Sequence, residues 1–458
     1  KDCNWQSALT KWVLADDNGE SKDVFIMAIH PERRQLSDEL HARPFHDFDG
    51  AGRFIRYVFL YDNSDQDIVS HINDWLTVQD RLPLGTREKF RRETFKNYIF
   101  RIERHTEFVT IGFIMKGETV RNGLTKGAFD KSAWPDLPFD VIDTVPASLF
   151  HAIWVEIGGR APAKLDPLKV QFMLNSQAEA SSQISDGAGQ LHCSFDIDEN
   201  EFSRAIVFHN CITPERMGRM VLRIIEMETY RMLALLGLPV ARKYLSTLVQ
   251  IEHKLTDLTQ QLTEQISRDD TEVQALLPAL SQLAAQVEEI SANTSYRLSA
   301  TKAYHDIFLA RLEGLRLARL NGHQGVYGFL DRRMMPAMQT CFAFGERVQT
   351  LSQRIERTGS LLRTQTETTI QRQNRDLLSS MDRRAQAQLR LQQTVEGLSV
   401  IAGTYYGVGL VGILAEGFNL QPPFDEIGLV KAFAVPFVAV VIWFFINRVS
   451  RSVRRLNR

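Results

Sequence analysis

A short stretch near the carboxyl end carries small and polar residues at regular spacing. Within Gly397–Ala415, which contains no charged residue, Ser399, Gly403 and Gly407 recur every four residues. On a helix this spacing places them on one face, where they either line a narrow conduit or let helix backbones approach closely. Tyr406 lies beside them, at a depth where a hydroxyl group needs a polar partner or water. Pore lining and helix packing both fit these residues.

Acidic side chains follow directly after this stretch. Glu416, Asp425 and Glu426 lie close together in the sequence, with Asn419 between them. In a symmetric oligomer these carboxylates would form rings that attract cations, and Asn419 would add a carbonyl oxygen at the mouth of a channel. The alternative is that they are ordinary solvated loop charges. A divalent cation is the one ligand they suggest, and we expect no other cofactor.

A second group of functional-looking residues lies near the amino end. Glu39, His41, His46 and Asp47 have side chains that hold metals or respond to pH. The two histidines are five residues apart across a proline, so they do not share a helical face. We therefore expect a structural clamp here, with Arg43 paired to a carboxylate, in preference to a metal site. The sequence contains no P-loop, nucleophile elbow or zinc signature, and we expect no enzyme activity.

Two apolar segments must position the carboxyl-terminal residues. Gly397–Ala415 and Ala432–Ile446 are both uncharged, and a membrane-spanning helix needs roughly 20 apolar residues. The second segment reaches that length if Ile427–Val430 belong to it. The sequence therefore predicts a hairpin of two transmembrane helices, with the lipid bilayer as a partner. A buried hydrophobic hairpin in a soluble protein is the alternative.

The charges that flank these segments predict their orientation. Arg383, Arg384 and Arg390 precede the first segment, and five arginines lie in the last eleven residues. The connecting loop holds two acidic residues and one lysine at its end. The positive-inside rule then places both termini in the cytoplasm and the loop outside.

Composition limits the remaining possibilities. The chain has 458 residues, enough for two or three domains, and its formal net charge of -1 gives no reason to expect a nucleic-acid partner. The four cysteines are scattered and lack metal-ligand spacing, which predicts reduced thiols in a cytoplasmic compartment.

The chain is expected to be α+β, with an N-terminal mixed α/β sheet domain, a long helical stalk or coiled-coil region and a C-terminal two-helix transmembrane hairpin. The expected parts are a cytoplasmic α/β domain (1–212), a coiled-coil-like helical domain (213–335), a stalk helix (336–396), a first span (397–417), an outer loop (418–431), a second span (432–447, or from 427) and a basic cytoplasmic tail (448–458).

Local patterns place the elements of the first two parts. Strands are predicted at 53–61, 98–103, 108–113, 149–157, 190–195 and 204–209, with 98–113 as a hairpin, and Arg81–Phe95 is expected to be a surface helix. Thr213 and Pro214 begin a helix that ends at Gly237. Leucines and isoleucines at three- and four-residue spacing then predict packed helices that end at Asn321-Gly322. The last helix is expected to begin at Pro336 and to be about 120 Å long, and its final part forms the first span.

Three sequence strings resemble the hallmarks of a bacterial family known as domain of unknown function 3422. They are LSDELHARPF (Leu36–Phe45), RIIEMETYRMLALLGLP (Arg223–Pro239) and LRLQQTVEGLSVIAGTYYGVGLVG (Leu389–Gly412). The resemblance covers nearly the whole chain. It implies a membrane-anchored protein of the bacterial inner (cytoplasmic) membrane, and it implies no particular chemistry.

The order of the expected parts also resembles the CorA family of magnesium transporters. Members of that family are pentamers whose first span lines a pore, and a Gly-Met-Asn tripeptide marks the outer end of that span. This chain has Ala415-Glu416-Gly417-Phe418-Asn419 there, so magnesium selectivity does not carry over. The resemblance implies a homo-oligomer that passes cations or another small solute. The alternative is a membrane-anchored scaffold whose α/β domain binds a partner without transport.

Overall fold

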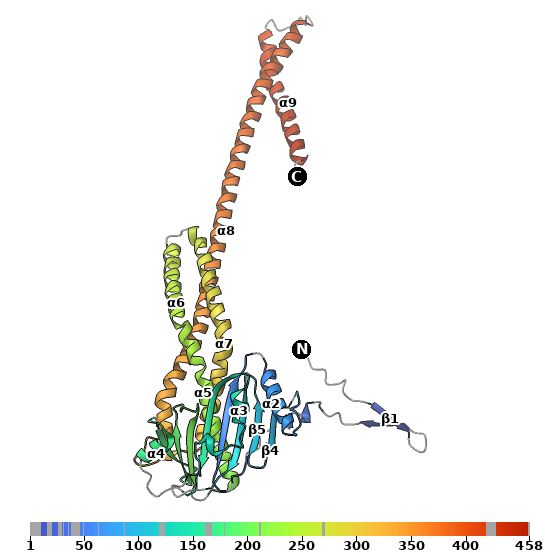
Figure 1. Cartoon of the computed structure of the whole chain (residues 1–458). Helices are drawn as coiled ribbons and strands as arrows, with labels where there is room; N and C mark the ends of the chain where they lie inside the picture. Colours follow the sequence, from blue (N-terminus) through green and yellow to red (C-terminus); the bar gives the residue numbers. More distant parts are fainter. Residues whose placement is uncertain are drawn as a thin grey trace. The chain divides into compact units, whose positions relative to one another are not determined.

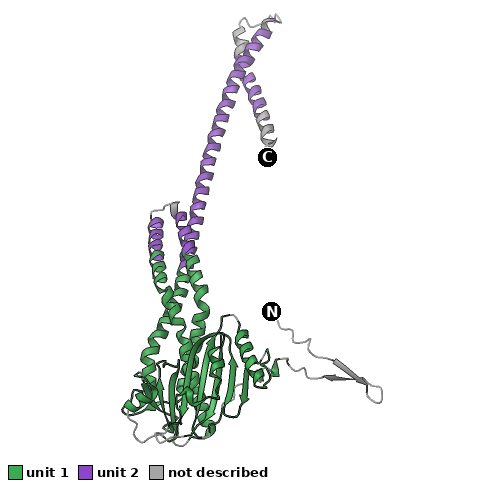
Figure 2. Ribbon diagram, viewed as in Figure 1, with its two compact units in different colours: residues 1–254, 283–354 green, residues 255–282, 355–458 purple. Residues whose placement is uncertain are grey.

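A computed structural model describes most of the chain, and it forms two compact units (Figure 2). The described residues are 11–15, 21–25, 30, 32–34, 36–37, 46–48, 50–62, 64–86, 88–118, 124–160, 167–177, 179–209, 212–267, 271–417 and 427–456. Unit 1 comprises residues 1–254 and 283–354, and unit 2 comprises residues 255–282 and 355–458. Each unit is described by itself below.

Unit 1 is built on a mixed sheet (Figure 1). Its nine strands have the order β11-β8-β9-β10-β7-β3-β6-β5-β4. Its strands are β3 (Gly52–Leu60), β4 (Phe90–Thr94), β5 (Ile99–Arg104), β6 (Phe108–Lys116), β7 (Ser148–Ile157), β8 (Glu179–Ile184), β9 (Gly189–Ser194), β10 (Ser203–His209) and β11 (Ala318–Arg319). The pair β10–β7 is parallel and every other pair is antiparallel. A separate hairpin pairs β1 (Lys11–Ala15) with β2 (Ser21–Phe25). The sheet confirms the expected mixed α/β domain, and β5 with β6 forms the expected hairpin.

One face of this sheet carries an aromatic core. Because successive strand residues point to opposite faces, Ile55, Tyr57 and Phe59 of β3 share this face with Trp154 of β7. Buried residues from three helices cover it: α2 (Gln66–Val78), α3 (Phe139–Asp143) and α4 (Pro167–Leu174). The ring of Phe113 lies within 6.5 Å of the ring centroids of Tyr57, Tyr98 and Phe100, and it is fully buried.

The opposite face is covered by α5 (Pro214–Leu235), which contacts β7 and β3. Thr213 is the N-cap residue in an extended conformation and Pro214 follows it, as the sequence predicts. The helix ends at Leu235, and α6 (Gly237–Ser267) begins directly after it. Glu226 of α5 pairs with Arg311 at 2.5 Å, which joins α5 to α7.

The remaining helices follow α6 in the chain. A 3-10 turn at Thr271–Leu276 leads into α7 (Leu277–Gly314). The 92-residue helix α8 (Val326–Gly417) begins in unit 1 and ends in unit 2, and α9 (Ile427–Leu456) belongs to unit 2. The helix α8 is continuous to the end of the first apolar segment, as expected.

Three local expectations are wrong. The described residues between 81 and 89 form no helix, and β4 follows them, because Phe90–Thr94 pairs along its whole length with β5. The helical region ends at Gly314, seven residues before Asn321, because Ala318 and Arg319 pair with β8. The last helix begins at Val326, ten residues before Pro336, because the Oγ of Ser182 in β8 accepts a hydrogen bond from the backbone N–H of Val326 at 3.0 Å.

Candidate functional site

The apolar parts of α8 and α9 contain the residues that the sequence singles out. A Cβ atom on Gly403 would lie 3.3 Å from the Cγ2 of Ile442, and one on Gly407 would lie 2.7 Å from the Cγ1 of Val438. The second distance is shorter than real side chains allow, so only glycine lets the backbones of α8 and α9 approach this closely. The structure therefore places both glycines against α9 within the same chain.

Tyr406 lies on a different side of α8 from the two glycines, whereas Ser399 borders a pocket that Ile446 of α9 also lines. Tyr406 is 71% exposed, and its ring packs edge-to-face on Tyr405 at 5.6 Å. Ser399 is also exposed, and its Oγ donates a hydrogen bond to the carbonyl of Val395 at 2.8 Å. Since that bond uses the donor, a lone pair of Ser399 remains available to another group. Of the expected four residues, the two glycines thus pack directly against α9, Ser399 borders the same helix, and Tyr406 is largely exposed.

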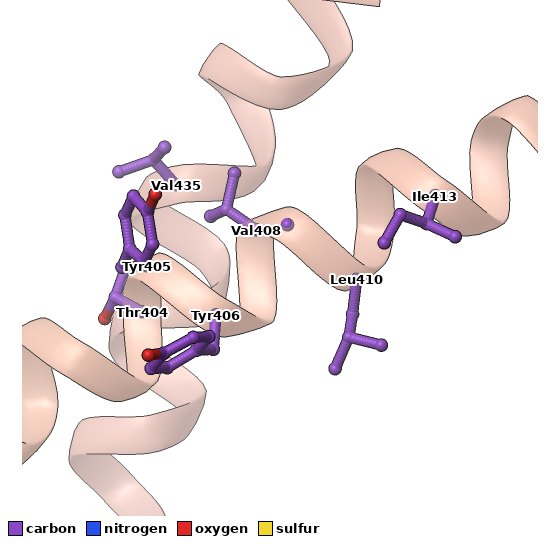
Figure 3. Close-up of a pocket in the computed structure, with 8 residues that line it drawn as sticks. Thr404, Tyr405, Tyr406, Val408, Leu410, Ile413 and Val435 are labelled. Carbon is purple, nitrogen blue, oxygen red and sulfur yellow. The ribbon is translucent and has the colours of Figure 1, made fainter.

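The tyrosine side of α8 borders an open apolar pocket of about 590 Å³ (Figure 3). Tyr405, Tyr406, Leu410 and Ile413 of α8 line it together with Val435 of α9. The lining is mostly apolar, and its hydroxyl groups belong to Thr404, Tyr405 and Tyr406.

The acidic residues at the end of the hairpin are mostly outside the described residues. Glu416 falls within α8, although the structure does not describe its side chain. Asn419, Asp425 and Glu426 lie outside the described residues, so the structure does not describe the expected outer mouth.

Substitution of Gly407 by leucine should separate α8 from α9. Its side chain would occupy the space of Val438, whereas a side chain at Gly409 would meet no atom within 4 Å, so that position should accept leucine within one chain. The measurement is disulfide formation in a Gly403→Cys/Ile442→Cys variant. We expect the disulfide in this background and in the background that also carries Gly409→Leu, and its loss with Gly407→Leu. An equal yield in both leucine variants would show that the glycines do not set the packing of the two helices.

The amino-terminal group of expected ligands is only partly described. Glu39, His41 and Arg43 lie outside the described residues. His46 is half-buried, and its Nδ1 is 2.9 Å from an Nη of Arg92. Burial and the charge of Arg92 lower the pKa of His46 to about 4. Within the described ranges, no group of three histidine, cysteine or acidic side chains has a metal-binding arrangement.

Unit 1 contains a buried charged cluster that the sequence analysis did not find. Arg53 of β3 and Glu156 of β7 have no exposed side-chain surface, and their charged atoms approach to 3.2 Å. The guanidinium group also donates to Thr125 and to the carbonyls of Lys126 and Gly127. A charged residue inside a largely apolar strand is the only sequence signal for each partner.

Aromatic rings complete this cluster. The Arg53 guanidinium lies 3.8 Å from the ring centroid of Trp134, and the Nε1 of Trp154 donates to Glu156 at 2.7 Å. Burial raises the pKa of Glu156 to about 7, against the lowering effect of the Arg53 charge. The cluster fastens the segment after residue 124 to the sheet.

A second buried cluster joins β8, β9 and the segment before α8. The Nδ1 of His192 is 2.7 Å from the Oγ of Ser181, and His323 faces His192 with ring centroids 5.9 Å apart. A serine beside a histidine resembles a nucleophile with its base, but both side chains are fully buried, so a substrate cannot reach the serine. His323 also lies 3.6 Å from Glu179, so this cluster fixes the chain just before α8 begins.

Two helical stretches of the described residues are long and apolar enough to cross a membrane, namely Pro214–Ser267 and Val326–Leu414. The apolar window of the first is 28% buried in the protein and that of the second only 6%. A shorter apolar helix covers Ala432–Arg448. These features are in keeping with an association with membranes.

Comparison with known proteins agrees with the resemblance of the three sequence strings. No curated protein matches the chain. The model of one family matches residues 28–453, nearly the whole chain. The chain therefore belongs to the family described as protein of unknown function (DUF3422).

Proposed function

We propose that the protein is an inner-membrane homo-oligomer that passes cations through a conduit lined by α8. In this proposal α8 and α9 cross the bilayer as a hairpin, with both termini in the cytoplasm. The apolar window of α8 supports insertion, because almost none of it is buried within the chain. The arginines that flank the hairpin support the orientation.

The proposal that copies of this chain assemble rests on a continuous exposed face of α8. Its members are spaced alternately by three and four residues, which is the heptad pattern of helices that pack side by side. We name it the α8 stripe: Leu378, Met381, Ala385, Gln388, Gln392, Val395, Ser399, Ala402, Tyr406, Gly409 and Ile413. Every member is exposed in the single chain. Because a heptad face fits another heptad face, copies of the same helix are its natural partners.

The composition of the α8 stripe supports the passage of cations. None of its residues is charged, although arginines lie at neighbouring positions 383, 384 and 390. Gln388, Gln392, Ser399 and Tyr406 would bring amide and hydroxyl oxygens to the axis of a bundle. Such oxygens replace the hydration shell of a cation, and the absence of arginine from the axis removes a repelling charge.

The resemblance to the CorA family is consistent with this assembly. A sheet domain, several intermediate helices, one long helix that includes the first apolar segment, and a second apolar helix occur here in the same order. That family forms pentamers, and we propose the same number of copies. The chain lacks the Gly-Met-Asn tripeptide, so we propose no selectivity for magnesium over other cations.

A flux assay in liposomes tests the proposal. Gly409 lies on the α8 stripe and Gly397 lies off it, and a side chain on either meets no atom within 4 Å in the single chain. We expect the purified protein to admit Mg²⁺ or K⁺ to dye-loaded liposomes. Gly409→Leu should lower the rate at least about tenfold, an added barrier of about 1.4 kcal/mol, because its side chains would meet at the axis. Gly397→Leu should conduct like the unchanged protein.

Two results would contradict conduction through the α8 stripe. The first is the absence of flux for both cations with protein that is demonstrably inserted and oligomeric. The second is equal flux in the two leucine variants. The first result would favour the alternative function, a membrane-anchored scaffold. One observation favours that alternative: Leu168 and Phe172 lie four residues apart on α4 and are 70% and 87% exposed, as at a site for a protein partner.

A further inference from the structure

Three arginines form one row across four adjacent strands at the β4 edge of the sheet. Arg92 of β4 lies opposite Arg101 of β5, which lies opposite Gly112 of β6, which in turn lies opposite Arg56 of β3. Directly opposed residues point to the same face of a sheet, so the three side chains are neighbours. We name Arg56, Arg92 and Arg101 the arginine row. Like charges in this arrangement oppose folding, which calls for a compensating partner.

The described residues supply only one carboxylate in contact with this row. The Oε1 atom of Glu103 lies 2.8 Å from an Nη of Arg101 and 3.5 Å from an Nη of Arg56, and it accepts a hydrogen bond from each. Arg92 instead contacts His46, whose pKa of about 4 leaves the imidazole neutral at pH 7. Within the described residues, the three positive charges of the row therefore contact one negative charge, and Asp47 adds a second negative charge that acts on His46.

The inner part of the row also has an unused donor. Arg101 is only 2% exposed, and its Nε has no hydrogen-bond acceptor among the described residues. Leaving a buried donor without an acceptor costs about 1–3 kcal/mol, and more for a charged group. Arg56 is 3% exposed and makes its one side-chain hydrogen bond within the described residues to Glu103. The two buried guanidinium groups thus hold more donors than Glu103 can satisfy.

The other end of the row is open to solvent. Arg92 is exposed and lies on β4, which is the edge strand of the sheet. Lys116 is also exposed, and its charge acts on His46 together with those of Arg92, Arg101 and Asp47. An anion that approaches β4 would therefore contact the exposed Arg92, and the positive charges of Arg101 and Arg56 would act on it from within the row.

We propose that the arginine row binds a phosphoryl dianion, either free phosphate or the phosphate of a small phosphomonoester. A phosphoryl group carries about two negative charges at pH 7 and three acceptor oxygens, which suits a row of three arginines with unused donors. Planar guanidinium groups bind such oxygens in pairs. This site lies wholly in unit 1, and its proposal does not depend on transport.

Calorimetric titration of the full-length purified protein tests the proposal. The probes are inorganic phosphate and glycerol 3-phosphate, and the stronger of the two identifies the source of the phosphoryl group. Arg92→Gln removes the exposed member of the row, and Lys96→Gln is the control, because it removes one exposed positive charge from the adjacent β4–β5 turn. We expect Arg92→Gln to weaken binding about tenfold or more, and Lys96→Gln to change it little.

Three outcomes would overturn the proposal. They are the absence of binding of both probes, equal weakening by the two variants, and undiminished binding in Arg92→Gln. Arg101→Gln should abolish binding altogether if that variant folds. The test does not require it to fold, because Arg92 is on the surface and its replacement leaves the buried pair with Glu103 in place.

Discussion

At pH 8, where its carboxyl group is ionised, replacement of Glu156 with alanine is expected to lower the free energy of unfolding of unit 1 by about 3–5 kcal/mol, because it removes one partner of a buried ion pair. The Arg53 guanidinium would lose the only carboxylate that it contacts among the described residues, and the Nε1 of Trp154 would lose its acceptor. Both charged side chains are fully buried, so bulk solvent does not replace the lost partner. Denaturant unfolding followed by tryptophan fluorescence measures the effect, because Trp134 and Trp154 border the cluster.

Two further variants make this result specific. Glu156→Gln keeps the shape of the side chain and a carbonyl oxygen that accepts from Trp154, so it should cost much less than alanine. Arg347→Met breaks a pair with Glu252 in which both side chains are more than a quarter exposed, and it should cost at most about 1 kcal/mol. If Glu156→Ala cost no more than Arg347→Met, the buried pair would contribute little to the stability of unit 1.

The same carboxyl group should make stability depend on pH in an unusual direction. Burial raises the pKa of Glu156 from 4.5 to about 7. Between these two values the folded protein binds a proton that the unfolded chain has released. The stability from this group is therefore fully present below pH 4.5 and is lost as the pH rises through about 7. The expected loss is about 3 kcal/mol for a difference of this size.

Comparison of the unchanged protein with Glu156→Gln isolates this effect. Other groups titrate in both proteins, including Glu103, whose pKa is lowered by its arginine neighbours although burial opposes them. Their contributions cancel in the difference between the two unfolding free energies. We expect the unfolding free energy of the unchanged protein to fall steadily, relative to that of Glu156→Gln, as the pH rises from 4.5 to 7.5. A difference that stays constant, or that rises with pH, would mean that Glu156 is ionised throughout this range.

Both effects depend on a contact that no local pattern reveals. Arg53 and Glu156 are 103 residues apart in the sequence, and each stands among the apolar residues of its strand. The pattern within each strand shows that a charged residue is unusual there, but it does not show which two charged residues form an ion pair. The register between β3 and β7, which places Arg53 opposite Glu156, is set by the packing of the whole sheet.

Local sequence patterns were sufficient where the structure depends on neighbours in the chain. Short runs rich in β-branched and aromatic residues predicted β3, the hairpin of β5 and β6, and strands β7, β9 and β10. Thr213 and Pro214 predicted the start of α5, because capping and the fixed φ of proline act within one turn. Uncharged runs of sufficient length likewise predicted the apolar parts of α8 and α9.

Tertiary structure decided the features that depend on distant segments. Phe90–Thr94 became a strand because β5 offered an unpaired edge, and α8 began at Val326 because Ser182 of β8 caps it. The spacing of Ser399, Gly403 and Gly407 fitted both pore lining and helix packing, and the position of α9 assigned the two glycines to helix packing. A sequence specifies its local periodicity directly, whereas a pairing between remote strands or helices exists only after both have folded against the same core.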